Sequence, residues 1–100
     1  MTTKTTPHWI NGQIITPIEG RFADVFNPAT GLVTSHVPLA STNDVDTAVS
    51  AAAAAWPAWA ATTSLRRSRV MFKFKNLLEE HADEIAKIIS QEHGKVLADA

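Results

Sequence analysis

The sequence predicts an α/β fold in which a small antiparallel β meander is followed by three or more α-helices. Two patterns support this prediction. Residues 8–40 contain short apolar segments separated by turn residues, whereas residues 41–100 carry apolar side chains at intervals of three and four. The first pattern is typical of strands and the second of helices. Residues 1–7 contain one lysine and no apolar cluster, so we expect them to form a flexible arm.

The meander is predicted from its turns. Asn11-Gly12 lies between apolar flanks, and both residue types tolerate the positive φ of a type I′ turn, which indicates a β-hairpin. Arg21–Phe26 and Leu32–Leu39 are predicted as the next two strands. The segment Asn27–Gly31 between them contains Pro28 and ends in glycine, which is typical of a turn.

The first helix is expected to begin at Ser41, whose hydroxyl can cap the free backbone amides, with Asp44 bonding back. Proline disfavours helical backbone at the residue before it, so we expect this helix to end at Trp56, before Pro57. One side of the helix should be buried. Its apolar stripe consists of Val45, Ala48, Val49, Ala52 and Trp56.

A second helical run is predicted from about Ser64 to Gly94. The residues Thr62-Thr63-Ser64 offer a cap, the apolar pattern restarts near His81, and Gly94 is a natural helix stop. Asp83 and Lys87 are spaced for an ion pair on the helix surface. Residues 96–100 are apolar enough to begin another helix, which favours a segment of a larger protein and an incomplete domain.

Composition excludes several kinds of chemistry. The net charge of −1 argues against recruitment of nucleic acid or an anionic membrane. There is no cysteine, so residues 1–100 supply no disulfide, cysteine zinc ligand or thiol nucleophile. The hydrophobic content of 45% is typical of a globular protein and argues against disorder.

Three groups of polar side chains are candidate sites, and each has a plainer interpretation. The histidines have no metal-ligand spacing; they are His8, His36, His81 and His93. The basic residues mostly occupy the faces left by the apolar pattern, as a solvated helix surface does; they are Arg66, Arg67, Arg69, Lys73 and Lys75. The acids are expected to face solvent rather than form a catalytic pair; they are Glu79, Glu80, Asp83 and Glu84.

Several motifs, taken in their order, resemble the opening of the aldehyde dehydrogenase superfamily. They extend over nearly the whole chain from Trp9 onward. The segments are Trp9-Ile10-Asn11-Gly12, Phe26–Gly31, Ser41 with Asp44–Val49, Trp56–Trp59, Arg67, and Glu92 with Gly94-Lys95. Within the superfamily, residues 69–74 and 92–100 are similar to the CoA-acylating methylmalonate-semialdehyde branch.

The resemblance implies a homotetrameric oxidoreductase that uses NAD, with coenzyme A as co-substrate. We expect a cytoplasmic protein, which the absence of cysteine fits. Such an enzyme would convert malonate or methylmalonate semialdehyde to acetyl- or propionyl-CoA with loss of CO2, in valine, thymine or inositol breakdown. The superfamily's cysteine, oxyanion asparagine and cofactor-binding residues lie beyond this segment. We therefore assign no catalytic, cofactor-binding or metal-binding residue within residues 1–100 and expect them alone to be inactive.

Two alternatives remain open. One is another NAD(P)-dependent aldehyde dehydrogenase, such as a succinate-semialdehyde type, and the other is a non-catalytic interaction module. A further hypothesis concerns Glu92. Some members of the superfamily hold a structural cation, and Glu92 with backbone oxygens near Val25 and Phe26 would form the analogous site. The plainer interpretation is a solvated or helix-capping Glu92.

Overall fold

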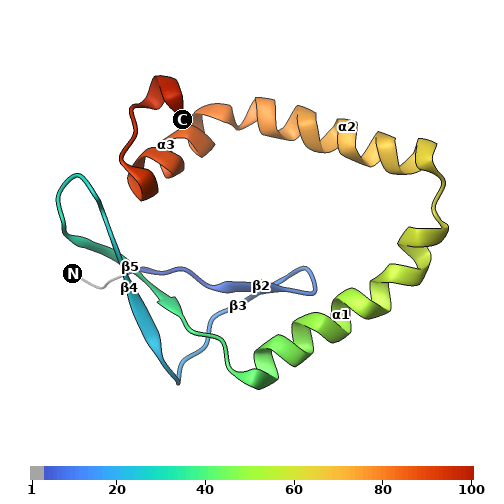
Figure 1. Cartoon of the computed structure of the whole chain (residues 1–100), viewed down its shortest axis with the longest axis horizontal. Coiled ribbons are helices and arrows are strands. Elements are labelled where there is room, and N and C mark those ends of the chain that lie inside the picture. The colour runs from blue at the N-terminus through green and yellow to red at the C-terminus, as the bar shows by residue number, and fades with distance from the viewer. Residues whose placement is uncertain (1–3) are drawn as a thin grey trace.

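The structure is a computed structural model that describes residues 4–100. Five short strands precede three helices, in agreement with the predicted α/β arrangement (Figure 1). The strands are β1 (Lys4–Thr5), β2 (His8–Ile10), β3 (Gln13–Ile15), β4 (Phe22–Phe26) and β5 (Val33–Pro38). The helices are α1 (Thr42–Ala61), α2 (Ser64–Glu80) and α3 (Ala82–His93), followed by a 3-10 turn at Leu97–Asp99.

The strands form two small sheets. β2 and β3 make the expected hairpin, with Asn11 at φ 54° and Gly12 at φ 72°, as a type I′ turn requires. β4 and β5 pair antiparallel, and β1 joins them in the order β1-β5-β4. The turn between β4 and β5 is closed by the amide of Gly31, which donates to the carbonyl of Asn27 at 2.7 Å.

The expectation of a flexible arm over residues 1–7 was wrong for the part that the structure describes. Lys4 and Thr5 pair in parallel with Ser35 and His36 of β5, and the amide of Thr6 donates to the His36 carbonyl at 2.8 Å. This pairing joins residues some thirty positions apart, so no local pattern signals it. Residues 1–3 lie outside the described part of the chain.

The prediction that the first helix ends before Pro57 was also wrong, because α1 continues through Pro57 to Ala61. Proline removes one helical hydrogen bond and disfavours the helical region for the preceding residue. The residues before Pro57 are mostly alanine, which has the highest helix propensity, and they offset that cost. The helix ends at Thr62, where the backbone is extended and the amide donates to the Ala58 carbonyl at 3.1 Å.

The predicted caps are confirmed. The amide of Ser41 donates to the Asp44 carboxylate at 2.9 Å, and the amide of Asp44 donates to the Ser41 hydroxyl at 3.1 Å, which forms a reciprocal capping box. Thr63 caps α2 by accepting from the Arg66 amide at 3.3 Å. At the other end, Gly94 stops α3 in the left-handed conformation at φ 86°.

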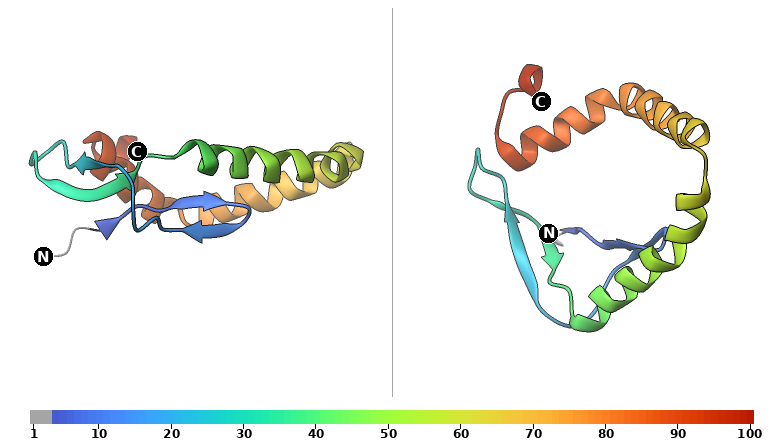
Figure 2. Two further views of the ribbon diagram at one scale, coloured as in Figure 1. Left: turned by 90° about the horizontal axis from the view of Figure 1, so that it is seen from below. Right: turned by 45° about the vertical axis from the view of Figure 1, so that its right-hand side comes forward.

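The elements form an open arc rather than a packed core. In Figure 1 the helices follow one another from β5 outward and return toward the β4–β5 turn, and Figure 2 shows how thin this arrangement is. The principal extents are 47 × 38 × 17 Å. Among residues 4–100, none of the large aliphatic or aromatic side chains is buried.

The predicted apolar stripe of α1 is present but not buried, so that expectation was wrong. Its start, Val45 and Ala48, faces another element, the strand β2. Val49 and Trp56 are 61% and 62% exposed. Within residues 4–100 these side chains have no partner surface, because α2 and α3 extend along the arc instead of folding back on α1. None of the described helices is both long and apolar enough to cross a membrane.

Candidate functional site

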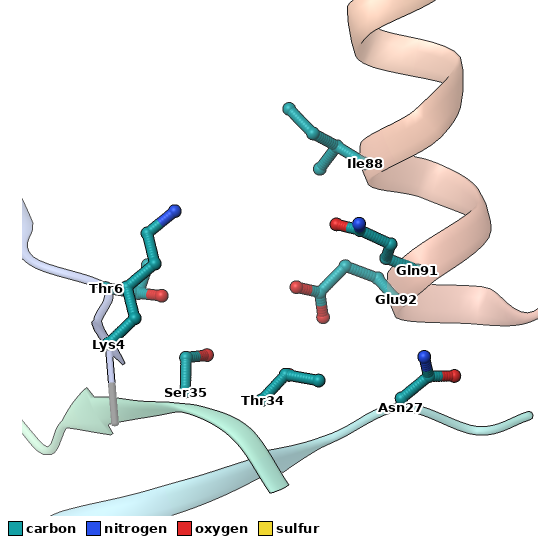
Figure 3. Close-up of a pocket in the computed structure, with 8 residues that line it drawn as sticks. All are labelled: Lys4, Thr6, Asn27, Thr34, Ser35, Ile88, Gln91 and Glu92. Atoms are coloured by element: carbon teal, nitrogen blue, oxygen red, sulfur yellow. The ribbon is translucent and has the colours of Figure 1, made fainter. Parts of the chain in front are cut away.

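A polar hollow lies between the strands and the last turns of α3, with a volume of about 470 Å³. Figure 3 shows its lining residues, which converge from three parts of the chain. They are Lys4 and Thr6 from the β1 region, Asn27, Thr34 and Ser35 from the strands and their turn, and Ile88, Gln91 and Glu92 from α3. It brings the β1 region close to the last turns of α3, which no local sequence pattern indicates.

Local backbone structure holds the strand side of this hollow. The Asn27 side chain accepts from the amide of Ala29 at 2.9 Å, which stiffens the turn. Thr34 donates its hydroxyl to the Val25 carbonyl at 3.2 Å, across β4 and β5. Ser35 is 7% exposed. This side is therefore formed by short polar side chains on paired strands.

The α3 side is held by a close contact between Gly94 and the β4–β5 turn. A Cβ atom placed on Gly94 would lie 3.1 Å from Cγ of Pro28, tighter than ordinary van der Waals contact. Glycine at position 94 therefore serves two purposes, since it also adopts the positive φ that ends α3. The contact places Glu92, two residues earlier, over the strands.

Glu92 is the one carboxylate among the lining residues of the hollow, and Asn27 directly follows Phe26. The arrangement places Glu92 near the strand end that the cation hypothesis requires. One backbone oxygen of that strand end, the Val25 carbonyl, already accepts from Thr34. Among residues 4–100, no group of three or more His, Asp or Glu side chains is placed to hold a metal ion. The Glu92 cation site stays a hypothesis.

The remaining titratable side chains form separate pairs rather than one centre. Nδ1 of His36 lies 2.9 Å from the Asp24 carboxylate across β4 and β5, and Nδ1 of His81 lies 3.4 Å from Glu84. The predicted pairing of Asp83 with Lys87 is absent from the ion pairs of residues 4–100. Both are solvent-exposed, where an ion pair gains little over hydration.

On α2, Lys75 contacts Glu79 at 2.8 Å, so part of the basic and acidic surface pairs within one helix. Both side chains are more than 60% exposed, which agrees with a solvated helix face. His93 occupies the last position of α3 and is the one basic residue of its last turn. None of these arrangements places a nucleophile beside a base.

Asp44 has a perturbed proton affinity for structural reasons. The Ser41 amide that donates to its carboxylate is the largest influence lowering the pKa of Asp44 below 3.8, and the Ser41 side chain acts in the same direction. His8, beside it in the small hollow between β2 and α1, also lowers it. The carboxylate belongs to the capping box and has no catalytic arrangement around it.

The hollow beside α3 does not fit a dinucleotide. Its lining combines the Glu92 carboxylate with Lys4, and the carboxylate would repel a pyrophosphate. The turn glycines Gly12 and Gly31 adopt positive φ at the ends of hairpins, and neither begins a helix as a nucleotide-binding turn does. We therefore derive no cofactor chemistry from residues 4–100.

The order of elements and the comparison with known proteins define the class. Residues 15–100 match the model of the aldehyde dehydrogenase family, and the chain belongs to that family. The chain is 48% identical over 96 residues to a malonate-semialdehyde dehydrogenase of Pseudomonas aeruginosa, covering 96% of this chain and 19% of the relative.

Solved structures agree with this relationship. A crystal structure from Sinorhizobium meliloti 1021, assigned as a methylmalonate-semialdehyde dehydrogenase and complexed with NAD, superposes with a TM-score of 0.92 at 44% identity. It covers 98% of this chain and 20% of that one. Lactaldehyde dehydrogenase from Escherichia coli superposes with a TM-score of 0.89 at 33% identity, covering 97% and 20%. The chain thus spans about a fifth of the length of these relatives.

Proposed function

We propose that residues 1–100 form the outer strand and helix layer of an NAD-dependent dehydrogenase acting on malonate or methylmalonate semialdehyde. The observation that carries the proposal is the gradient of identity among relatives of the same fold. It is 48% and 44% for the semialdehyde relatives but 33% for lactaldehyde dehydrogenase. An ordinary aldehyde dehydrogenase is the alternative, and the lower identity to lactaldehyde dehydrogenase counts against it.

Two features favour a structural rather than a catalytic role for residues 1–100: they contain no cysteine, and the apolar faces of their helices are exposed. With no cysteine, residues 1–100 offer no thiolate to attack an aldehyde, so the nucleophile belongs to another part of the enzyme. The uncovered apolar faces of α1 and α2 suit a layer that packs on such a part. In this proposal NAD and the catalytic groups are bound outside residues 1–100.

The proposed reaction is CoA-acylating. The aldehyde carbon would be oxidised to an enzyme thioester with NAD as hydride acceptor, and the thiol of CoA would displace the enzyme thiolate. The bond to the substrate carboxylate would break to release CO2, and the carbon that carried it would take up a proton. The products are acetyl- or propionyl-CoA, NADH and CO2, consistent with valine, thymine or inositol breakdown. We further propose a cytoplasmic homotetramer. These features rest on the family relationship and not on a group within residues 4–100.

A chimera tests whether the chain acts as a structural layer. The matched 96 residues of the Pseudomonas aeruginosa relative are replaced by the corresponding residues of this chain. We expect the chimera to assemble and to reduce NAD with malonate semialdehyde, whereas the relative lacking this segment should be inactive. A chimera that folds no better than the deletion would contradict the proposal and favour a separate interaction module.

Substrate class requires the complete polypeptide that contains residues 1–100. We expect NADH and acyl-CoA to form in equal amounts from malonate or methylmalonate semialdehyde, and little turnover of succinate semialdehyde. Turnover that is independent of CoA, or a preference for succinate semialdehyde, would favour the alternative dehydrogenase instead.

A further inference from the structure

One basic residue of α2 does not lie on the solvated side of the helix. Val70, Met71 and Phe74 follow Arg67 by three, four and seven residues, and Leu78 follows it by eleven. At 3.6 residues per turn these positions share one face, so Arg67 lies within the apolar stripe. The basic residues were expected to occupy mostly the remaining faces, and Arg67 is an exception to that pattern.

Arg69 is a natural contrast. It lies two residues after Arg67, which places it on the nearly opposite side of α2, and it is exposed. Arg67 is half-buried although α2 has no buried residue. An arginine in the apolar stripe and an arginine outside it thus occur within one turn of the same helix.

Arg67 also lacks a partner among residues 4–100. Its Nε is shielded from solvent and has no hydrogen-bond acceptor, and none of the ion pairs in this part of the chain includes Arg67. A shielded donor without an acceptor is unfavourable, and in native proteins such groups are usually paired. The stripe around it is open, since Met71 and Phe74 are 56% and 51% exposed.

We propose that Arg67 is a positioning residue that pairs with a carboxylate on the part of the enzyme that covers the apolar stripe of α2. This inference rests on the proposed function, which supplies that part. Covering the stripe would remove the guanidinium from water, and a desolvated charge requires an opposite charge with good geometry. A carboxylate meets both needs because it neutralises the charge and accepts two parallel hydrogen bonds from the planar guanidinium.

A backbone carbonyl is a weaker partner for the Arg67 guanidinium, since it accepts hydrogen bonds but leaves the positive charge uncompensated. The charges at the start of α2 also favour an acidic partner. Within four residues the start of α2 carries Arg66, Arg67 and Arg69 and no acid, and the first acid of α2 is Glu79. An acidic side chain on the covering surface therefore fits this end of the helix.

The test uses the chimeric enzyme and compares R67M with R69M and R67K. Methionine keeps much of the arginine stem but removes the charge. We expect R67M to lower the thermal midpoint by roughly 3–5 °C, because the partner carboxylate is left buried and unpaired. R67K keeps the positive charge but cannot donate two parallel hydrogen bonds, so its thermal midpoint should lie between those of R67M and the parent chimera. R69M should have nearly the same midpoint as the parent.

Chemical rescue separates a carboxylate partner from general packing. In R67A, guanidinium ion at millimolar concentration should raise the midpoint toward that of the parent, and it should have no such effect on R69A. Equal midpoints for R67M and R69M, or a rise in stability for R67M, would overturn the proposal. So would a loss in R67A that guanidinium does not restore.

The two proposals fail differently. If the parent chimera does not assemble, the structural-layer proposal fails. If it assembles and reduces NAD but its stability is indifferent to position 67, the Arg67 inference alone fails.

Discussion

Gly94 at the end of α3 lies against the ring of Pro28 in the β4–β5 turn, with only 3.1 Å between Pro28 Cγ and the place where a Cβ would stand. The two residues are far apart in sequence and belong to separate motifs, Asn27–Gly31 and Glu92–Lys95. Their contact lies where the end of α3 returns toward the β4–β5 turn in Figure 1.

Replacing Gly94 with alanine should destabilise the chimeric enzyme in two ways. The left-handed conformation costs an L-residue about 1–2 kcal/mol, and the new methyl group must also displace the Pro28 ring. We expect a total loss of about 2–3 kcal/mol, measured by urea unfolding. Gly31→Ala is the matched control, because Gly31 has φ 74° but open space around its Cβ position. Equal losses at both positions would show that the contact with Pro28 contributes nothing.

The capping box should make the start of α1 sensitive to acid. The pKa of Asp44 is lower in the folded chain than its ordinary value of 3.8. The ionised carboxylate therefore stabilises the folded state fully at pH values above 3.8. The contribution is lost as the pH falls through the lower folded-state value.

Asp44→Asn keeps a side-chain acceptor for the Ser41 amide but removes the titration. Circular dichroism between pH 7 and pH 2 should show a steeper loss of helix in the parent than in this variant. The two proteins share every other acid, so the difference between their two pH curves isolates Asp44. Parallel curves would contradict the assigned role.

The isolated chain of residues 1–100 should bind a hydrophobic dye such as ANS and unfold without a sharp cooperative transition. The reason is that its large apolar side chains are uncovered, with Trp9 70% and Phe72 65% exposed. Fluorescence titration and differential scanning calorimetry measure both properties. A cooperative, dye-silent monomer would contradict the proposal that these faces pack on another part of the enzyme.

Short-range features were predictable from the sequence. The Asn11-Gly12 hairpin, the Ser41–Asp44 capping box and the helix stop at Gly94 each depend on residues within four positions of one another. The predicted helix end at Pro57 was wrong. The prediction considered the proline alone, whereas the surrounding alanines have high helix propensity and favour a continuous helix.

The candidate site was only half predictable. Glu92 and the strand end near Phe26 were linked through the family resemblance, and the hollow does bring Glu92 and Asn27 to the same space. Lys4 and Thr6 were missed, because their pairing with β5 leaves no periodic signal in a segment of two residues. The position of Arg67 in the apolar stripe could have been predicted, because its sequence intervals to the apolar residues of α2 are those of one helix face.

By itself the sequence determined the family, the element types and most of the helix and turn boundaries. It could do so because hydrogen bonds between near neighbours and side-chain periodicity act over a few residues. Only the tertiary structure decided that β1 joins β5, that α3 returns to the β4–β5 turn through Gly94 and Pro28, and that the apolar faces stay open. Those outcomes depend on contacts between distant segments, whose energies no local stretch of sequence contains.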